Sequence, residues 1–415
     1  MGATPSLLGG GLPAGLPLKY GSLGEGGGVL ALASLPSTSP PVLVAVSSSG
    51  VSQYNMLTGD RTLRMAAALH AYTCGVHCPG LSLLAVGTGQ GEVLLLHAHT
   101  LQRVRALAAP AAAAVTSLAF LPPSTLFAGY SDGQVCSYSA GAGAMLRAYP
   151  PPSSAPPGAA LAATAIALCL APPTPAALKA GTTSPPLLQL LAVGHASGML
   201  VLHEATDSEE AASGGSPSPS SSSSRLSFPP PSPPLLTTPL TGLLHLRSLN
   251  CLAAYGAGCN TLVLLDIAKG RVVALDFAAE LQSVNRAWAQ LSTAVWDEAR
   301  GCMLVGGGDG AVYVREIARI AGTGDVAVTL RRVAPPCAAS DAPAPITVML
   351  YHSKADALLC GDSAGLVRRV RKAVGEGAGG DAAGAGGEGA GAAAEDRACL
   401  PVSAAVGGGG GGAPV

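Results

Sequence analysis

One pattern of apolar and polar positions recurs along the chain. A run of four or five apolar residues ends in a small residue or glycine, a short polar turn follows, and a second run with alternating apolar positions comes next. Asp-Gly, Ser-Gly and Asn-Thr turns supply the positive φ that a tight reversal needs, so each copy predicts a β-hairpin. The seven predicted hairpins cover residues 43–51, 83–93, 126–135, 190–200, 252–262, 303–312 and 358–367.

The spacing of these hairpins indicates a repeat protein. Their turns centre on residues 50, 91, 133, 198, 260, 310 and 365. The first two intervals match the length of a four-stranded propeller blade. The longer intervals contain proline-rich segments at 150–157 and 172–186 and a Ser/Pro tract at 213–234. Such segments bury too little apolar surface to offset the entropy of ordering them, so we predict flexible loops there.

Other apolar runs complete the predicted blades. Runs before several hairpins predict inner strands, and a less apolar run, such as residues 271–275, predicts an outer strand after them. The predicted inner strands include residues 115–122, 166–168, 293–296 and 346–351. Four strands in each of seven repeats predict an all-β fold, a seven-bladed β-propeller of four-stranded antiparallel blades. Closure of the ring protects sheet edges that an open array would expose.

Three regions follow from this organisation. Residues 1–28 form an N-terminal segment, partly disordered, and residues 29–372 form the propeller, with a low-complexity Ser/Pro insertion at about 206–236. Residues 373–415 form a Gly/Ala-rich tail that we expect to be disordered. The seventh blade lacks an outer strand in its own repeat, and either residues 16–20 or residues 398–403 would supply it.

The ends of the hairpins resemble those of WD40-repeat proteins. In residues 262–271, Leu265 stands in the Trp place and Asp266 in the Asp place of the family's ending, and residues 54–60 resemble its Trp-Asp-x-x-Thr-Gly-Lys form. The pair is degenerate in the other blades: Leu96-His97, Tyr138-Ser139, His203-Glu204, Arg315-Glu316 and Val370-Arg371. The literal dipeptide Trp296-Asp297 ends an inner-strand run instead. The resemblance covers roughly residues 29–372 and implies a propeller that binds other proteins.

Composition and charge exclude several other classes. The chain has 415 residues, of which 48% are hydrophobic but only 4% aromatic, and its 55 Gly and 34 Pro disfavour a helical bundle. With 23 Lys and Arg against 24 Asp and Glu, no overall field attracts nucleic acid. The most apolar stretch, residues 159–171, is too short for a transmembrane helix. Ten scattered cysteines and the absence of a secretory signal predict a cytoplasmic protein with reduced thiols.

Two clusters contain residue types that bind metals. Residues 74–78 read Cys-Gly-Val-His-Cys and residues 97–99 read His-Ala-His, but neither has the second ligand pair that a zinc site needs nearby. Cys74, Val76 and Cys78 would instead share one buried face of a strand, and the two histidines would lie at a hairpin edge. We therefore predict no metal site and no cofactor.

Catalytic motifs are also missing from the sequence. The glycine run at 306–310 joins two predicted strands, whereas phosphate-binding loops open a helix. There is no Gly-x-Ser-x-Gly, so we predict no catalytic residues and no enzyme activity. Three turn aspartates, Asp132, Asp309 and Asp362, are expected to accept backbone N–H bonds.

These observations favour a protein–protein interaction scaffold or adaptor within a multi-subunit complex. A rigid ring presents many short loops, and exposed Tyr and Arg side chains on them would carry the affinity. We expect that role for Tyr130, Tyr255 and Arg315. Two alternatives are a propeller that binds a small ligand or acts as an enzyme, and a peripheral membrane propeller.

The last two blades are the most basic part of the chain. Residues 300–372 contain ten Lys or Arg against six Asp or Glu, and Arg368 and Arg369 are the candidate contacts there. Such a patch would suit an acidic peptide or a lipid headgroup. The alternative is a solvated strand face whose charge is balanced by the acidic residues of the tail.

Overall fold

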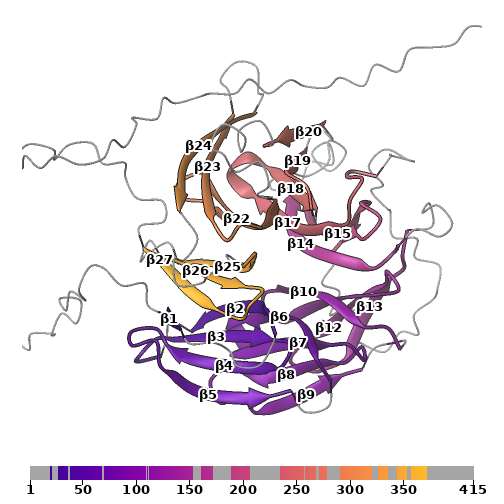
Figure 1. Ribbon diagram of the computed structural model, residues 1–415. Helices are drawn as coiled ribbons and strands as arrows, with labels where there is room; N and C mark the ends of the chain where they lie inside the picture. Colours follow the sequence, from indigo (N-terminus) through magenta and orange to yellow (C-terminus); the bar gives the residue numbers. More distant parts are fainter. Residues whose placement is uncertain are drawn as a thin grey trace, which may run out of the picture.

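The computed structural model arranges the chain as seven antiparallel sheets around a central axis (Figure 1). The predicted seven-bladed β-propeller is confirmed. The structure describes residues 19–20, 27–35, 38–67, 70–108, 110, 112–152, 160–171, 188–205, 234–256, 258–267, 271–277, 290–319, 326–334, 344–352 and 357–371. No helix in this described part of the chain is long and apolar enough to cross a bilayer.

Blades 1 to 3 each contain four strands, in chain order from the central axis to the rim. Blade 1 comprises β2 (Val29–Leu35), β3 (Val42–Ser47), β4 (Gly50–Asn55) and β5 (Arg61–Ala66). Blade 2 comprises β6 (Tyr72–Cys78), β7 (Leu83–Thr88), β8 (Val93–His97) and β9 (Arg103–Leu107). Blade 3 comprises β10 (Val115–Leu121), β11 (Thr125–Tyr130), β12 (Val135–Ser139) and β13 (Met145–Tyr149).

Blades 4 to 6 follow the same order. Blade 4 has three described strands, β14 (Ala163–Ala171), β15 (Leu188–His195) and β16 (Leu200–Glu204), and the Ser/Pro tract after them lies outside the described residues. Blade 5 comprises β17 (Leu240–Leu246), β18 (Cys251–Gly256), β19 (Thr261–Asp266) and β20 (Arg271–Asp276). Blade 6 comprises β21 (Leu291–Asp297), β22 (Cys302–Gly307), β23 (Val312–Arg319) and β24 (Val326–Ala334).

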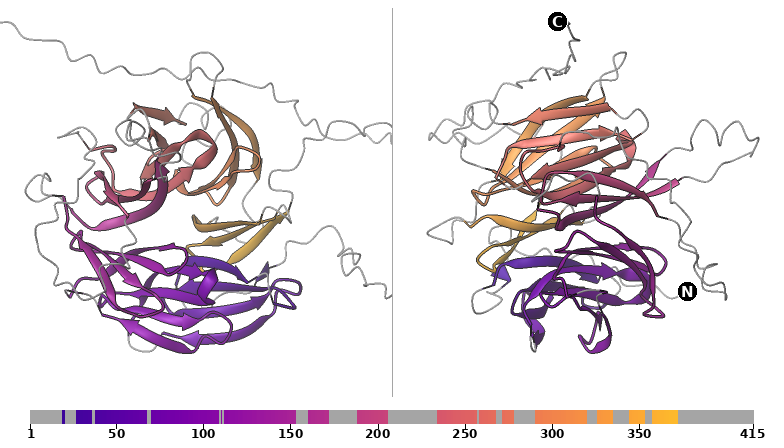
Figure 2. Two further views of the ribbon diagram at one scale, coloured as in Figure 1. Left: turned by 180° about the vertical axis from the view of Figure 1, so that it is seen from behind. Right: turned by 90° about the vertical axis from the view of Figure 1, so that its right-hand side faces the viewer.

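Blade 7 is completed by the N-terminal part of the chain. It comprises β25 (Ile346–His352), β26 (Ala357–Asp362) and β27 (Val367–Arg371), and its outer strand is β1 (Lys19–Tyr20). The backbone of Lys19 pairs with Arg368, and that of Tyr20 with Val367. Of the two segments expected to close the ring, the N-terminal one therefore does so, and residues 398–403 lie outside the described residues. Figure 2 shows the closed ring from behind and from the side.

The hairpin turns use glycine as the sequence predicts, with one exception. Gly91, Gly133, Gly198, Gly310 and Gly365 have φ between +75° and +91°. In the fifth hairpin the positive φ belongs to Gly258 at +70°, so the predicted Asn260-Thr261 turn is wrong by two residues. The three turn aspartates accept backbone N–H bonds as predicted: Asp132 from Gln134 at 3.0 Å, Asp309 from Ala311 at 3.0 Å and Asp362 from Leu366 at 2.8 Å.

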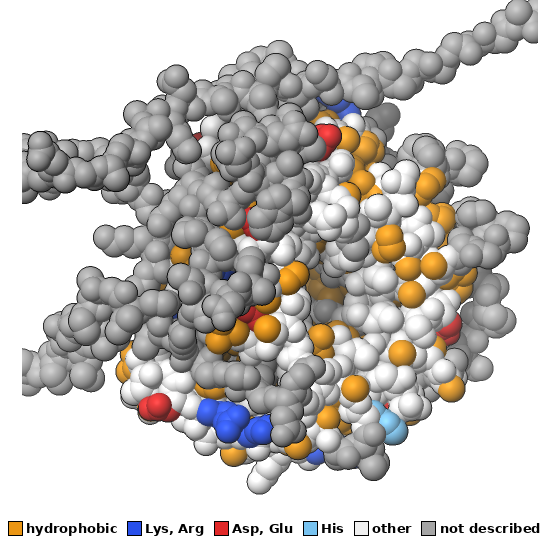
Figure 3. All heavy atoms as spheres, in the orientation of Figure 1, with side chains coloured by type: hydrophobic (Ala, Val, Ile, Leu, Met, Phe, Trp, Pro, Cys, Tyr) orange, Lys and Arg blue, Asp and Glu red, His pale blue; other side chains and the backbone are white. Residues whose placement is uncertain are grey.

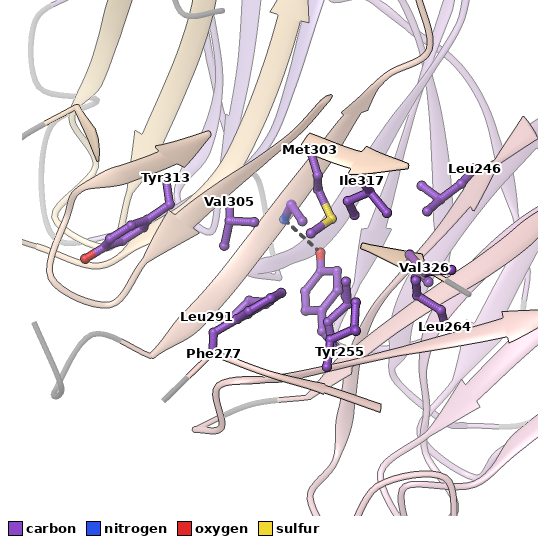
Figure 4. Packing of buried hydrophobic residues seen from close by; sticks show 14 of the residues in the cluster. Leu246, Tyr255, Leu264, Phe277, Leu291, Met303, Val305, Tyr313, Ile317 and Val326 are labelled. Carbon is purple, nitrogen blue, oxygen red and sulfur yellow. Dashed lines mark hydrogen bonds between the residues drawn. The ribbon is translucent and has the colours of Figure 1, made fainter. Parts of the chain in front are cut away.

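The core is divided among the seven junctions between blades. Each of seven buried clusters is made by two neighbouring blades, largely from Ala, Val and Leu because the chain has few aromatics. Figure 4 shows the cluster between blades 5 and 6, where the Tyr255 hydroxyl accepts a hydrogen bond from the Ala294 amide at 3.1 Å. A Cβ at Gly242 would lie 1.9 Å from the Tyr255 ring, so this close contact requires glycine.

Hydroxyl groups join the inner strands at one end of the ring. Each inner strand has a β-bulge at its second residue. That residue is Leu30, Thr73, Thr116, Thr164, Thr241, Ser292 or Thr347. Three of the six Thr and Ser side chains donate to the next blade, and we call these three the latch hydroxyls. Thr116 donates to Ala163 O of the next blade at 2.6 Å, Thr164 donates to Leu240 O, and Thr347 donates to Val29 O at 2.5 Å.

Candidate functional site

Three of the five predicted contact residues are buried. The side chains of Tyr130, Tyr255 and Arg315 are 1%, 5% and 1% exposed, so the expectation that they lie exposed on loops is wrong. Tyr130 is the last residue of β11 and packs at the junction with blade 2, whereas Tyr255 is the next-to-last residue of β18 and packs at the junction with blade 6. The Tyr130 hydroxyl is hydrogen-bonded to the Tyr138 hydroxyl at 2.7 Å.

Arg315 lies on the third strand of blade 6, at the position that the sequence resemblance aligned with the tryptophan of the WD40 repeat. Each of the other blades has an equivalent residue on its third strand, which pairs with the same position of the second strand as Arg315 does. They are Tyr54, Leu96, Tyr138, His203, Leu265 and Val370. The Arg315 guanidinium lies over the Phe277 ring, 3.8 Å from its centroid, and 5.7 Å from that of Tyr313. A flat, stacked guanidinium thus fills a buried position that aliphatic, aromatic or imidazole side chains occupy in the other blades.

Arginines of the last blades are largely engaged within the ring. Arg319 forms an ion pair with Asp266 of blade 5 at 2.9 Å, and Arg300 forms one with Asp297 at 3.1 Å. Arg368 donates to the Gly310 carbonyl, and both Arg368 and Arg369 are half-buried. The side chains of residues 331, 332 and 371 lie outside the described part. The predicted basic patch is therefore less available than the sequence indicates.

Seven half-buried side chains lie at the opposite end of the inner strands from the latch hydroxyls, and several of them also pack against the clusters between blades. These residues lie near the end of each inner strand and pair with equivalent residues of the second strands. They are Ser34, His77, Phe120, Leu168, His245, Trp296 and Tyr351, and we call them the mouth ring. Five of the seven are aromatic or imidazole rings, although aromatics supply only 4% of the chain. Figure 3 shows the channel as a hollow at the centre of the molecule.

Polar contacts between blades fix the mouth ring in blades 5 to 7. The indole Nε1 of Trp296 donates to Glu298 Oε2 at 2.5 Å, and Glu298 also accepts the amide of Ser248 from blade 5. The guanidinium of Arg300 donates to the hydroxyl of Tyr351 in blade 7. These hydrogen bonds therefore hold the Trp296 and Tyr351 rings in place within the propeller.

The pKa values of both imidazoles of the mouth ring are lower than the usual value for histidine. Burial lowers the pKa of His77, and the nearby His99 lowers it further. Burial also lowers the pKa of His245, helped by Arg247 and opposed by Glu298. Both side chains are neutral near pH 7 and behave as flat, weakly polar surfaces.

The two sequence clusters that suggested metals belong to blade 2. Cys74, Val76 and Cys78 pack at the junction with blade 3, as the strand reading predicts. Burial raises the pKa of the Cys74 thiol to about 11 and that of Cys78 to about 12. The rings of His97 and His99 are 5.6 Å apart. Among the residues that the structure describes, no group of three or more His, Cys, Asp or Glu is placed to hold a metal ion.

The mouth ring was missed at the sequence level. Trp296 attracted notice only as half of a literal Trp-Asp pair. A usable signal was present in four blades, because His77, His245, Trp296 and Tyr351 precede the hairpins of their blades by the same distance. Aligning the blades on their hairpins would have placed these four residues in one column.

Comparisons with known proteins support the fold. No protein-family model matches the chain, and no curated protein matches it in sequence. A chain from the crystal structure of the mitotic checkpoint complex aligns with a TM-score of 0.55 at 14% identity, over 89% of this chain and 98% of that one. The computationally designed Ika8 protein aligns with a TM-score of 0.50 at 16% identity, over 84% and 98%. At such identities, the likeness concerns the propeller fold alone.

Proposed function

We propose that the protein is a non-catalytic, WD40-like propeller that binds other proteins as a scaffold or adaptor of a cytoplasmic multi-subunit complex. The mouth ring is the observation that carries this proposal. Its aromatic members Phe120, Trp296 and Tyr351 are partly exposed, whereas the other aromatic side chains that the structure describes are buried. The degenerate hairpin endings, including Leu265-Asp266, support the WD40-like class. The structural similarity to a chain of a mitotic checkpoint complex is compatible with a role in assemblies.

The chemistry of the mouth ring favours a partner segment with apolar side chains and a few hydrogen-bonding groups. Trp296, Tyr351 and Phe120 offer flat apolar faces, whereas Arg300 and Glu298 supply charged groups beside them. Half-buried rings lose little further rotamer freedom on binding, so most of the buried area contributes to affinity. The neutral imidazoles of His77 and His245 add contact surface without a charge that a partner must neutralise.

Affinity purification of the tagged full-length protein under gentle salt, followed by mass spectrometry, tests this function. Stable partners should accompany the wild type and be lost from the double variant Trp296→Ala, Tyr351→Ala. The matched control is Val272→Ala, which removes an exposed aliphatic side chain from the rim of blade 5 and should keep every partner. Unchanged far-UV circular dichroism must accompany the loss.

Two results would count against the proposal. Partners that remain on the double variant would show that the mouth ring is not the contact surface. A wild-type protein that purifies without any partner would favour a small-ligand or enzymatic propeller instead.

A further inference from the structure

Three consecutive outer strands carry the same irregularity. In β5, β9 and β13 the register with the third strand shifts by one residue, which leaves Thr62, Val104 and Leu146 as extra residues. Such bulges bend the strand and break the regular edge. Val104 and Leu146 are 56% and 40% exposed, and Met145 beside Leu146 is 51% exposed. Three adjacent blades thus present an outward bulge at the rim.

Arginines flank these bulges. We call residues 61–64, 103–105 and 145–147 the rim surface. Arg61, Arg64, Arg103 and Arg105 are exposed, and Arg105 reaches across to blade 3, where it donates to Gly141 O at 3.2 Å. Arg147 lies over the Tyr149 ring, 4.9 Å from its centroid. Figure 3 shows basic side chains at the rim over the first blades.

The rim surface carries more positive than negative charge, although the exposed Asp60 lies directly before Arg61. Residues 27–152 contain five Arg and no Lys, against three acidic residues, Asp60, Glu92 and Asp132. Glu92 and Asp132 lie at the turns between second and third strands, away from the outer strands. Within the described part of the chain, Arg61, Arg64 and Arg103 form no ion pair. This is the reverse of the last blades, where Arg300 and Arg319 are paired.

We propose that the rim surface binds an extended acidic segment of a partner protein that carries aliphatic side chains between its carboxylates. A guanidinium matches a carboxylate in a two-bonded geometry, which explains why arginine serves here and lysine does not. Val104, Leu146 and Met145 lie between the arginines and cover the aliphatic side chains. Because the bulges break the strand edges, recognition proceeds through side chains instead of strand addition. The rim surface is separate from the mouth ring, so two partners bind at once.

Protection of the strand edges is the competing explanation. Bulges and charged side chains on an outer strand also prevent edges of different molecules from pairing. The two explanations separate under charge reversal, since glutamate protects an edge as well as arginine does but repels an acidic segment. Replacement by alanine removes the charge that protects the edge, so an alanine variant should self-associate if edge protection is the role of these arginines.

The experiment uses the full-length protein and a fluorescein-labelled synthetic peptide of alternating glutamate and valine, with anisotropy as the measurement. The triple variant Arg61→Glu, Arg64→Glu, Arg103→Glu should weaken peptide binding at least about tenfold. Val104→Ser should weaken it about threefold. Arg271→Glu, on the outer strand of blade 5, is the matched control and should change the affinity less than about twofold. Wild-type affinity should fall as salt is added.

The proposal is overturned if the triple variant binds the peptide as the wild type does. It is also overturned if a lysine–valine peptide binds equally well, or if phosphatidylserine vesicles, and not the peptide, bind through these arginines. If the corresponding triple alanine variant self-associates but binds the peptide as the wild type does, the proposal is overturned and the arginines serve to protect the strand edges. The Trp296→Ala, Tyr351→Ala variant should bind the peptide normally, so failure at the rim and failure at the mouth ring are distinguishable.

Discussion

The latch hydroxyl of Thr347 should stabilise the closure of the ring. It donates to Val29 O across the junction between blades 7 and 1, at 2.5 Å, and lies 3.3 Å from Gly361 O of its own blade. Thr347→Val keeps the shape of the side chain and removes only the hydroxyl. Because the site is partly open to water, which can hydrate the freed carbonyl, we expect a loss of about 1 kcal/mol in the free energy of unfolding.

Thr116 provides the matched comparison. Its hydroxyl also crosses to the next blade, but the acceptor, Ala163 O, receives a second hydrogen bond from Ser117 at 2.7 Å. Thr116→Val or Ser117→Ala alone leaves that carbonyl paired, so each should cost about 0.5 kcal/mol. The double variant leaves it without either hydroxyl and should cost more than the sum of the two single changes.

Urea unfolding followed by far-UV circular dichroism measures these differences as shifts of the midpoint at constant slope. The reasoning is refuted if Thr347→Val unfolds within about 0.3 kcal/mol of the wild type. It is also refuted if the losses of unfolding free energy from the Thr116 and Ser117 changes are additive. Additivity would mean that the two hydroxyls do not share the Ala163 carbonyl as their acceptor.

Three further predictions concern buried positions. Gly242→Ala should lower the free energy of unfolding by about 3 kcal/mol, because its Cβ would lie 1.9 Å from a tyrosine ring, whereas Gly89→Ala, with nothing within 4 Å, should change it by less than about 0.5 kcal/mol in the same urea assay. Arg315→Ala should cost at least about 2 kcal/mol through the lost packing over Phe277, and Arg315→Met should recover part of it; equal losses would contradict a packing role. Burial lowers the pKa of His195 in the folded state, so its stabilising effect is complete above the unfolded pKa of about 6.5 and declines as the pH falls below it. His195→Gln should therefore flatten the fall in the urea midpoint between about pH 7.5 and pH 5.5, and an unchanged slope would contradict this.

The local features of the fold could be predicted from the sequence. Glycine at a positive φ and the apolar runs beside it are properties of a few neighbouring residues, so all seven hairpins were found. The sequence left two candidate segments for the outer strand of blade 7, and the pairing of Lys19 with Arg368 shows that the N-terminal segment supplies it. The fifth turn was misplaced because Gly258 and Asn260 are both turn residues, and only the backbone shows which of them reverses the chain.

Features that depend on the register between blades could not be predicted. Tyr255 and Arg315 were expected on exposed loops, but the pairing of their strands turns each side chain into a junction between blades. The latch hydroxyl of Thr164 was not anticipated either, because its acceptor, Leu240 O, is 76 residues away along the chain. The exposed residue Val104 owes its position to a bulge, which an alternating pattern does not reveal.

The closure of blade 7 by β1 has a consequence for synthesis on the ribosome. Tyr20 pairs with Val367, so the first strand to emerge must wait for about 350 further residues before its partner exists. At about 10 residues per second, that delay is roughly half a minute. During this time β1 has no partner strand, and the face of blade 1 that packs against blade 7 stays exposed. The last blade to be translated therefore decides when this apolar face can be buried.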